Sequence, residues 1–182
     1  MLISFFYLYL KIIRFTMNNS RRRFIRNIST AAILSGTAGL PLITTGKSFR
    51  TKGKLGIALV GLGYYSTDLL APGLQKTENC YLAGIVTGTP EKEKIWSDKY
   101  GIPRKNIYNY GNFDDIAGNR DIDVVYVVLP NNMHREFTIR AARAGKHVIC
   151  EKPMALNADE CHEMISACKE AGVTLSIGYR LR

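Results

Sequence analysis

The chain has 182 residues, 46% of them hydrophobic and 22% charged, a composition that is typical of a globular protein and excludes a disordered one. The formal net charge is +10, but residues 1–50 contain eight of the 25 Lys and Arg residues and no acid, which leaves 17 basic residues against 15 acidic ones elsewhere. Because the excess charge is confined to that first segment, we expect no nucleic-acid partner. The four cysteines form no CxxC pair, so the sequence predicts neither a metal site nor a disulfide framework.

Residues 1–46 are predicted to form a targeting leader. Ser20, Arg21 and Arg22 are followed by Phe24 and then by a mildly apolar stretch over 28–43, which is the layout of a twin-arginine export signal. This layout predicts a periplasmic or otherwise exported protein. A membrane anchor with a basic end is the alternative, because no clear A-x-A cleavage motif follows residue 43.

Two further features bear on the leader. Met17 lies shortly before the arginine pair, and we expect translation to start there. The roughly ten apolar residues before Lys11 are too few to cross a bilayer as a helix, so no stable membrane span is expected. Residues 47–53 are polar and glycine-containing and are interpreted as a linker, and residues 54–182 as one domain.

From residue 54 onward the sequence alternates short apolar runs with amphipathic segments. Strands are expected over 55–60, 81–87, 107–108, 122–129, 147–150 and 173–177, and helices over 68–76, 90–100, 113–117, 133–144 and 157–171. Pro72 and Gly73 predict an irregular first helix. The alternation predicts an α/β fold, a Rossmann-type doubly wound parallel sheet with right-handed crossovers.

A glycine-rich turn follows the first predicted strand directly. Gly61 and Gly63 occupy the first two positions of the dinucleotide fingerprint, and Ser66 stands where a third Gly or Ala is usual. Gly61 permits the tight turn, Gly63 permits close approach of a pyrophosphate, and the next helix supplies backbone N–H groups. A serine is small enough for the third position, where the helix packs on the strand. The sequence therefore predicts a dinucleotide-binding turn.

The second predicted strand ends without the acid that usually binds the ribose hydroxyls of NAD. It ends at Thr87, and Lys92 and Lys94 follow shortly after. A hydroxyl and an ammonium group suit a 2′-phosphate better than a carboxylate does, which favours NADP over NAD. The alternative is that both lysines only solvate an exposed helix.

Polar residues also follow the fourth and fifth predicted strands. His134 follows the segment Leu129-Pro130-Asn131 and could contact a ligand, or could be an ordinary helix-capping histidine. Glu151 and Lys152 follow the fifth strand, where two ions are costly unless they are used. Lys152 could donate to a substrate oxygen while Glu151 holds the lysine or a ribose, and a plain local ion pair is the alternative.

The remaining sulfur-containing residues fit a structural role. Cys150 is interpreted as a small buried residue and not as a nucleophile. Cys161, Met164, Ile165 and Cys168 have the spacing of one helical face, which predicts that they face the core.

These motifs together resemble the amino-terminal domain of the Gfo/Idh/MocA oxidoreductases. The matching segments run from Ala58 to Tyr65, from Val86 to Lys92, from Lys105 to Phe113, from Val125 to His134, from Ala144 to Met154 and from Ile177 to Arg180. Within that family the chain is most similar to the glucose–fructose oxidoreductases. The resemblance implies a catalytic residue, Lys152, and an NADP site made of Gly61, Leu62, Gly63, Tyr64, Tyr65, Thr87, Lys92, Tyr108, Leu129, Pro130, Asn131, His134, Glu151, Lys152 and Arg180.

The resemblance also implies an activity. Members of the family pass a hydride between a sugar hydroxyl or carbonyl and the nicotinamide, and a second, carboxy-terminal domain forms the sugar pocket. That domain should begin just after Arg180, so we expect this chain to lack it and to be inactive alone, and a full-length form to be a homo-oligomer. Alternatives are the cofactor domain of a related NAD-dependent glycosidase, and a non-catalytic nucleotide-binding remnant.

Overall fold

The computed structural model describes residues 53–179, of which residues 54–179 belong to one compact unit. The predicted leader, nearly all of the linker, and Arg180 lie outside the described residues, so the predictions made for them stay predictions.

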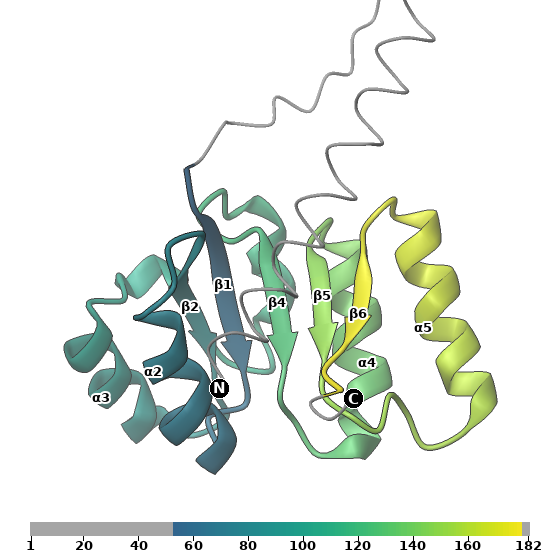
Figure 1. Ribbon diagram of the computed structural model, residues 1–182, viewed down its shortest axis with the longest axis horizontal. Helices are drawn as coiled ribbons and strands as arrows, with labels where there is room; N and C mark the ends of the chain where they lie inside the picture. The colour runs from purple at the N-terminus through teal and green to yellow at the C-terminus, as the bar shows by residue number, and fades with distance from the viewer. Residues whose placement is uncertain (1–52, 180–182) are drawn as a thin grey trace, which may run out of the picture. The chain divides into compact units, whose positions relative to one another are not determined.

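The described residues form a six-stranded sheet with helices between the strands (Figure 1). The strand order is β3-β2-β1-β4-β5-β6, and every neighbouring pair is parallel. This arrangement confirms the predicted doubly wound sheet. The strands are β1 Leu55–Val60, β2 Cys80–Val86, β3 Ile107–Tyr108, β4 Val124–Val127, β5 His147–Cys150 and β6 Leu175–Ile177. The helical segments are η1 Tyr65–Leu70, α2 Ala71–Leu74, α3 Pro90–Tyr100, η2 Arg104–Asn106, η3 Phe113–Gly118, α4 Asn131–Arg143 and α5 Ala158–Glu170.

The two halves of the sheet carry their own helices. Figure 1 shows α2 and α3 beside β1 and β2, and α4 and α5 beside the strands β4 to β6. Because side chains alternate along a strand, Val125 and Val127 share one face of β4, and there they join a core with Phe137 of α4 and Met164 of α5. The runs of apolar residues in β1 and β4 are thus explained by burial on both faces.

The first helix is irregular, as predicted, but it begins earlier than expected. Its first part, η1, is a π-helix in which the Ala71 N–H donates to the Ser66 carbonyl, and the short α2 follows. Pro72 has no N–H to donate to the carbonyl of Asp68, so regular α-helical bonding cannot run through this point.

Helix α5 begins and ends where its polar residues predict. Asn157 caps it, because its Oδ1 accepts the backbone N–H of Glu160 at 2.9 Å. Met164 and Cys168 are buried and Cys161 is partly buried, but the prediction for Ile165 was wrong, since half of its side chain is exposed.

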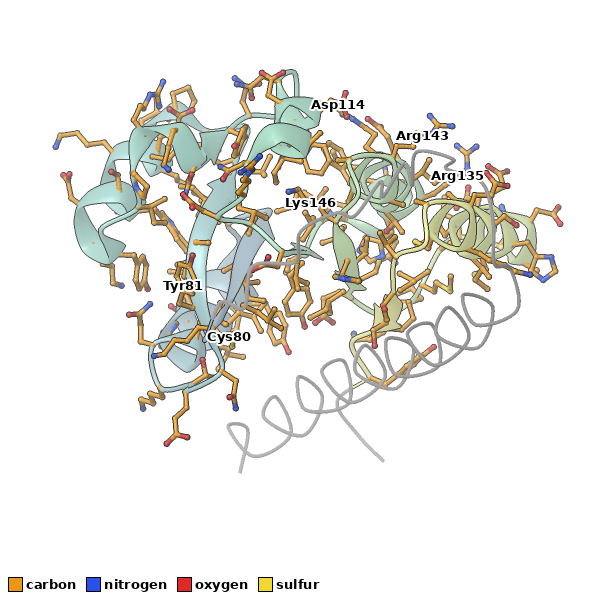
Figure 2. All side chains as sticks on the ribbon, turned by 90° about the horizontal axis from the view of Figure 1, so that it is seen from above. Cys80, Tyr81, Asp114, Arg135, Arg143 and Lys146 are labelled. Carbon is orange, nitrogen blue, oxygen red and sulfur yellow. The ribbon has the colours of Figure 1, made fainter. Side chains whose placement is uncertain are left out.

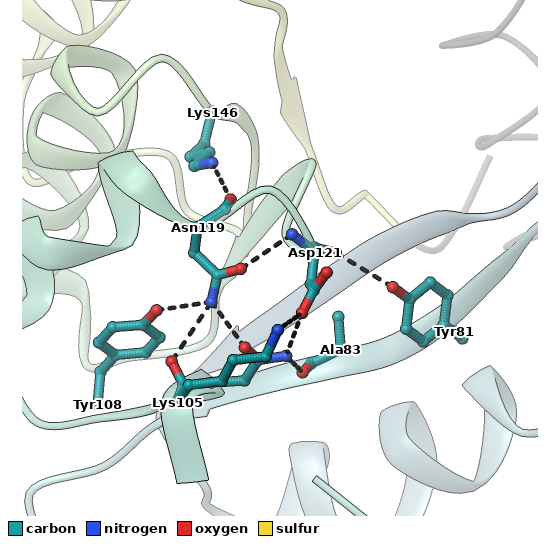
Figure 3. Close-up of polar contacts among 8 residues, drawn as sticks. Tyr81, Ala83, Lys105, Tyr108, Asn119, Asp121 and Lys146 are labelled. Carbon is teal, nitrogen blue, oxygen red and sulfur yellow. Dashed lines mark hydrogen bonds and ion pairs between the residues drawn. The ribbon is translucent and has the colours of Figure 1, made fainter. Parts of the chain in front are cut away.

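Polar side chains close the amino edge of the sheet, where the strands start (Figure 3). Asn106 Nδ2 donates to the Ala83 carbonyl at 2.8 Å. Asn119 Nδ2 donates to Asn106 Oδ1 at 2.7 Å and to the Tyr108 hydroxyl at 2.8 Å. These bonds fasten the crossover between β3 and β4 to strand β2.

Lys146 strengthens the same edge from the start of β5. It lies between the two halves of the molecule in Figure 2, and it is buried. Its Nζ donates to the carbonyls of Asn119 and Ile122 at 2.7 and 3.0 Å. Lys105 and Asp121 form an ion pair at 2.7 Å beside it. We call the residues Asn106, Asn119, Asp121, Lys105 and Lys146 the amino-edge network.

Candidate dinucleotide-binding site

The order of the strands in the sheet shows where the candidate site lies. Chain connections leave β1 toward β2 and leave β4 toward β5, so the strand order reverses between β1 and β4, which are neighbours. In such sheets ligands bind in the crevice outside the carboxyl ends of these strands. The predicted residues that follow β1, β2, β4 and β5 all lie at this carboxyl edge, because all the strands are parallel.

The turn after β1 has the geometry that a dinucleotide requires. Gly61 has φ +91°, and a Cβ there would lie 2.4 Å from the Val128 carbonyl oxygen, so only glycine fits. A Cβ at Gly63 would meet nothing within 4 Å, and this residue is exposed. Gly61 is therefore required by the protein itself, whereas the space at Gly63 is open toward a ligand.

Ser66 explains how the turn tolerates a change at its third position. The side chain is fully buried, and its Oγ donates to the Gly61 carbonyl at 2.6 Å. The serine therefore packs the helix against the strand, as predicted, and also ties the start of the turn. The small size of serine predicts its packing role, whereas its hydrogen bond to Gly61 becomes visible only in the folded turn.

Lys92 lies beside the glycine turn. Its Nζ donates to the Leu62 carbonyl at 2.7 Å. Lys94 instead forms an exposed ion pair with Asp98 at 2.6 Å, one turn along α3, and Asp98 raises the pKa of Lys94. The two lysines are therefore not equivalent, and Lys92 is the cation that stands next to the turn.

Thr87 lies directly after β2, on the same side of the crevice. It is buried, its N–H donates to the Tyr108 carbonyl at 3.0 Å, and its Oγ1 accepts the Thr89 N–H at 3.1 Å. The Tyr108 side chain points the other way, because its hydroxyl accepts a hydrogen bond from Asn119 in the amino-edge network. The structure thus brings Thr87 and Lys92 to the carboxyl edge, but it does not bring the Tyr108 hydroxyl there.

His134 is buried completely behind the turn that follows β4. Its Nδ1 lies 2.9 Å from the Pro153 carbonyl oxygen, and its Nε2 lies 2.8 Å from the Leu129 carbonyl oxygen. Both ring nitrogens thus face backbone oxygens of the protein. Pro130 and Asn131, in contrast, are exposed at the edge.

Glu151 and Lys152 do not form an ion pair with each other. Glu151 Oε1 accepts the Tyr126 hydroxyl at 2.6 Å, and its Oε2 accepts the backbone N–H of Lys152 at 3.3 Å. Within residues 53–179 the Lys152 ammonium has no ion-pair partner, and the side chain is exposed. The alternative of a local ion pair is wrong for these residues, so the Lys152 ammonium stands at the edge available to a ligand.

Tyr126 is a residue of this site that the sequence reasoning missed. It is buried in β4, yet its hydroxyl requires a partner there. The sequence does contain an indication of this, because Tyr126 is the only residue with a polar side-chain group in the apolar run Val124–Val127.

Cys150 fits its predicted structural role. It is fully buried at the end of β5, and burial raises the pKa of its thiol to about 12. The thiol therefore stays protonated at neutral pH, which is unsuitable for a nucleophile.

Two other kinds of feature are absent from residues 53–179. No three His, Cys, Asp or Glu side chains are grouped there so as to hold a metal ion. The helices of this part are too short or too polar to span a bilayer.

The parallel sheet, the glycine turn at its switch point and the polar carboxyl edge define a dinucleotide-binding α/β domain. The comparison with protein families agrees: the model of the Gfo/Idh/MocA oxidoreductases, described as an oxidoreductase family with an NAD-binding Rossmann fold, matches residues 55–179. The chain belongs to this family, and the described part is its NAD(P)-binding domain.

Several known proteins are similar to this chain. The crystal structure of aldose-aldose oxidoreductase from Caulobacter crescentus is 55% identical with a TM-score of 0.68, over 69% of this chain and 38% of that one. The 1,5-anhydro-D-fructose reductase of Ensifer adhaerens is 48% identical over 101 residues, which are 56% of this chain and 29% of that protein. D-xylose 1-dehydrogenase (NADP(+)) 2 of Haloferax volcanii is 34% identical over 130 residues, which are 71% of this chain and 37% of that protein.

The chain thus spans between 29% and 38% of the length of these relatives. The similarity supports the family that the sequence predicts, while the finer likeness to glucose–fructose oxidoreductases stays a prediction.

Proposed function

We propose that this chain is the NADP-binding domain of an exported oxidoreductase that transfers a hydride between a sugar and the nicotinamide. The observation that carries the cofactor preference is the position of Lys92. Its Nζ lies 2.7 Å from the Leu62 carbonyl oxygen in the glycine turn, and the end of β2, where an acid would be expected in an NAD-binding domain, is occupied by Thr87. Relatives support the sugar substrate, since their names refer to aldoses, anhydrofructose and xylose, and two of the xylose dehydrogenases carry NADP(+) in their names.

The residues of the carboxyl edge fit such a cofactor in a specific way. The open space at Gly63 and the helix N-terminus after it would accept the pyrophosphate. Thr87 and Lys92 would hold the adenosine ribose and its 2′-phosphate, and the segments after β4 and β5 would face the nicotinamide half. When bound, the nicotinamide supplies hydride transfer.

Lys152 is the proposed catalytic residue. Oxidation of a sugar alcohol passes a hydride from carbon to the nicotinamide and a proton from oxygen to a base, which the second domain of the family would supply, so negative charge develops on that oxygen in the transition state. The exposed Lys152 ammonium would donate a hydrogen bond to the oxygen and stabilise this charge. The remaining sugar contacts would come from a second domain, as in the family.

Titration of the 182-residue chain with NADP, NADPH and NAD, followed by calorimetry and nucleotide fluorescence, tests the cofactor assignment. We expect micromolar binding of NADP and weaker binding of NAD. Replacing Lys92 with Met should reduce NADP affinity about tenfold and leave NAD affinity unchanged, because only NADP carries the 2′-phosphate. The matched variant Lys94→Met should bind as the wild type does. Equal loss of both nucleotides in Lys92→Met would contradict the assignment.

Export is a separate part of the proposal, and it rests on the leader sequence alone. A folded fluorescent reporter fused after residue 53 should reach the periplasm of a host that has the twin-arginine pathway. The double substitution Arg21→Lys and Arg22→Lys should stop it, whereas Arg26→Lys should not. A reporter exported equally well by all three leaders would overturn this part.

A further inference from the structure

Each chain neighbour of Lys152 is bonded to a side chain from β4 or α4. On one side, Glu151 accepts the Tyr126 hydroxyl at 2.6 Å. On the other, the Pro153 carbonyl oxygen lies 2.9 Å from His134 Nδ1. Lys152 itself is exposed between these two anchored neighbours.

Glu151, which accepts the hydrogen bond from Tyr126, is held in place by its surroundings. The Glu151 N–H donates to the Val127 carbonyl at 3.0 Å, which aligns this residue with the end of β4. A Cβ at Gly178 would lie 2.9 Å from Glu151 Oε1, so the glycine after β6 leaves the room that this carboxylate occupies. The carboxylate is thus directed toward Tyr126 and Gly178 and forms no ion pair with the Lys152 ammonium.

The contact to His134 joins two loops of the site. Its second ring nitrogen, Nε2, lies 2.8 Å from the Leu129 carbonyl oxygen, in the turn that joins β4 to Asn131 at the start of α4. A neutral imidazole donates from one nitrogen and a protonated one from both, and either form bonds to at least one loop. The ring is fully buried and both its nitrogens face backbone oxygens, so no ring nitrogen is left to bind a ligand in the crevice.

We infer that Tyr126 and His134 are positioning residues that fix Lys152 against the nicotinamide half of the cofactor. This inference rests on the proposed function and gives a different role to His134, which the family resemblance places among the cofactor contacts. Removing either side chain frees one neighbour of Lys152 without touching the β2 side of the crevice, where Thr87 and Lys92 lie. The two halves of the cofactor should therefore respond differently.

The test compares two ligands on the 182-residue chain. NADPH occupies both halves of the crevice, while adenosine 2′,5′-bisphosphate contains only the adenosine half with its 2′-phosphate. In Tyr126→Phe and in His134→Gln, NADPH affinity should fall roughly fivefold to tenfold, the equivalent of one hydrogen bond, with a change in nicotinamide fluorescence. Affinity for the bisphosphate should stay that of the wild type.

Matched controls remove the same groups elsewhere. Tyr81→Phe removes a hydroxyl that donates to the Asp121 carbonyl at the amino edge, and His162→Gln replaces an exposed histidine on α5. Both should bind both ligands normally. Folded Tyr126→Phe and His134→Gln proteins that bind both ligands as the wild type does, or that lose both equally, would overturn the inference. A wild-type chain that binds neither ligand would instead reject the proposed function, and the inference with it.

A second measurement covers the case in which His134→Gln does not fold. Nitrogen-15 spectra of the wild-type chain should show an imidazole N–H of His134 that exchanges slowly with water, because the ring is buried and bonded. A ring N–H that exchanges as fast as that of His162 would overturn the role of His134.

Discussion

The two edges of the sheet use polar residues in different ways. At the amino edge, the side-chain nitrogens of Asn106, Asn119 and Lys146 donate to other groups of the protein, in four hydrogen bonds of 2.7–2.8 Å. At the carboxyl edge, buried groups such as Ser66 and His134 bond to backbone carbonyls, while Lys152 is exposed. The first edge holds the fold together, and the second is arranged so that a few groups remain accessible. The role of a polar residue in this domain therefore depends on the edge of the sheet at which it lies.

The largest effect is expected in the glycine turn. Gly61→Ala should lower the free energy of unfolding by about 2–4 kcal/mol, because the positive φ is unfavourable for alanine and its Cβ meets the Val128 carbonyl at 2.4 Å. Gly63→Ala, which meets nothing within 4 Å, should leave stability unchanged but weaken NADP binding. Urea unfolding and NADP titration of both variants provide the measurement. Equal destabilisation by the two changes would show that Gly63 is not reserved for a ligand.

The next effect concerns the amino edge. Lys146→Met should lower the free energy of unfolding by about 2–3 kcal/mol, because two carbonyls that accept from the ammonium lose their donor. NADP affinity should not change. Lys94→Met, at an exposed ion pair, should leave stability unchanged in the same urea unfolding experiment. A Lys146 variant of normal stability but reduced NADP affinity would reverse the roles that we assign to the two edges.

A smaller effect is expected from Thr87→Asp. A carboxylate there would repel the 2′-phosphate and accept ribose hydroxyls, so NADP affinity should fall about tenfold and NAD affinity should rise. Thr87→Asn, of similar size and without charge, should keep the preference for NADP. Calorimetric titration of both variants measures the change, and unaltered NADP affinity in Thr87→Asp would refute our account of the β2 side.

The smallest effect is a pH dependence at the amino edge. Burial lowers the pKa of His147 below its ordinary value of 6.5, although Asp123 acts in the opposite sense, and its Nδ1 accepts the Thr174 N–H at 3.0 Å. The imidazole of His147 is therefore protonated less readily in the folded chain than in the unfolded chain. The contribution of His147 to stability is fully present above pH 6.5 and declines as the pH falls below that value.

Urea unfolding between pH 5 and 8 should show this decline in the wild type. In His147→Gln the decline should be smaller, because the glutamine oxygen can accept the same N–H and does not titrate in this range. His162→Gln, at an exposed position, should behave as the wild type. An identical slope in the His147 variant would mean that other groups cause the dependence.

The sequence predicts most of the fold because its elements carry strong local signals. The β-branched run that forms β4, the Asn157 cap of α5 and the glycine turn after β1 each depend on neighbouring residues, and each was predicted. Helix α4 starts two residues earlier than expected, and β4 is shorter at both ends, because element ends depend on tertiary contacts.

The candidate site is predicted less completely. Local sequence motifs predicted that Gly61, Thr87 and Lys152 lie at the carboxyl edge. They could not predict in which direction long side chains point. Tyr108 turns toward Asn119, which is eleven residues away in the chain, and Glu151 turns toward Tyr126, which is twenty-five away. Such pairings between residues distant in the sequence form only when the chain has folded.

Amide NMR spectra of the nitrogen-15-labelled chain, titrated with NADP, test the central contrast most directly. We predict shifts at the carboxyl edge, at Gly61, Gly63, Thr87 and Lys152, and none at Asn106, Asn119 or Lys146. Shifts concentrated in the amino-edge network, or spectra that NADP does not change, would contradict the account.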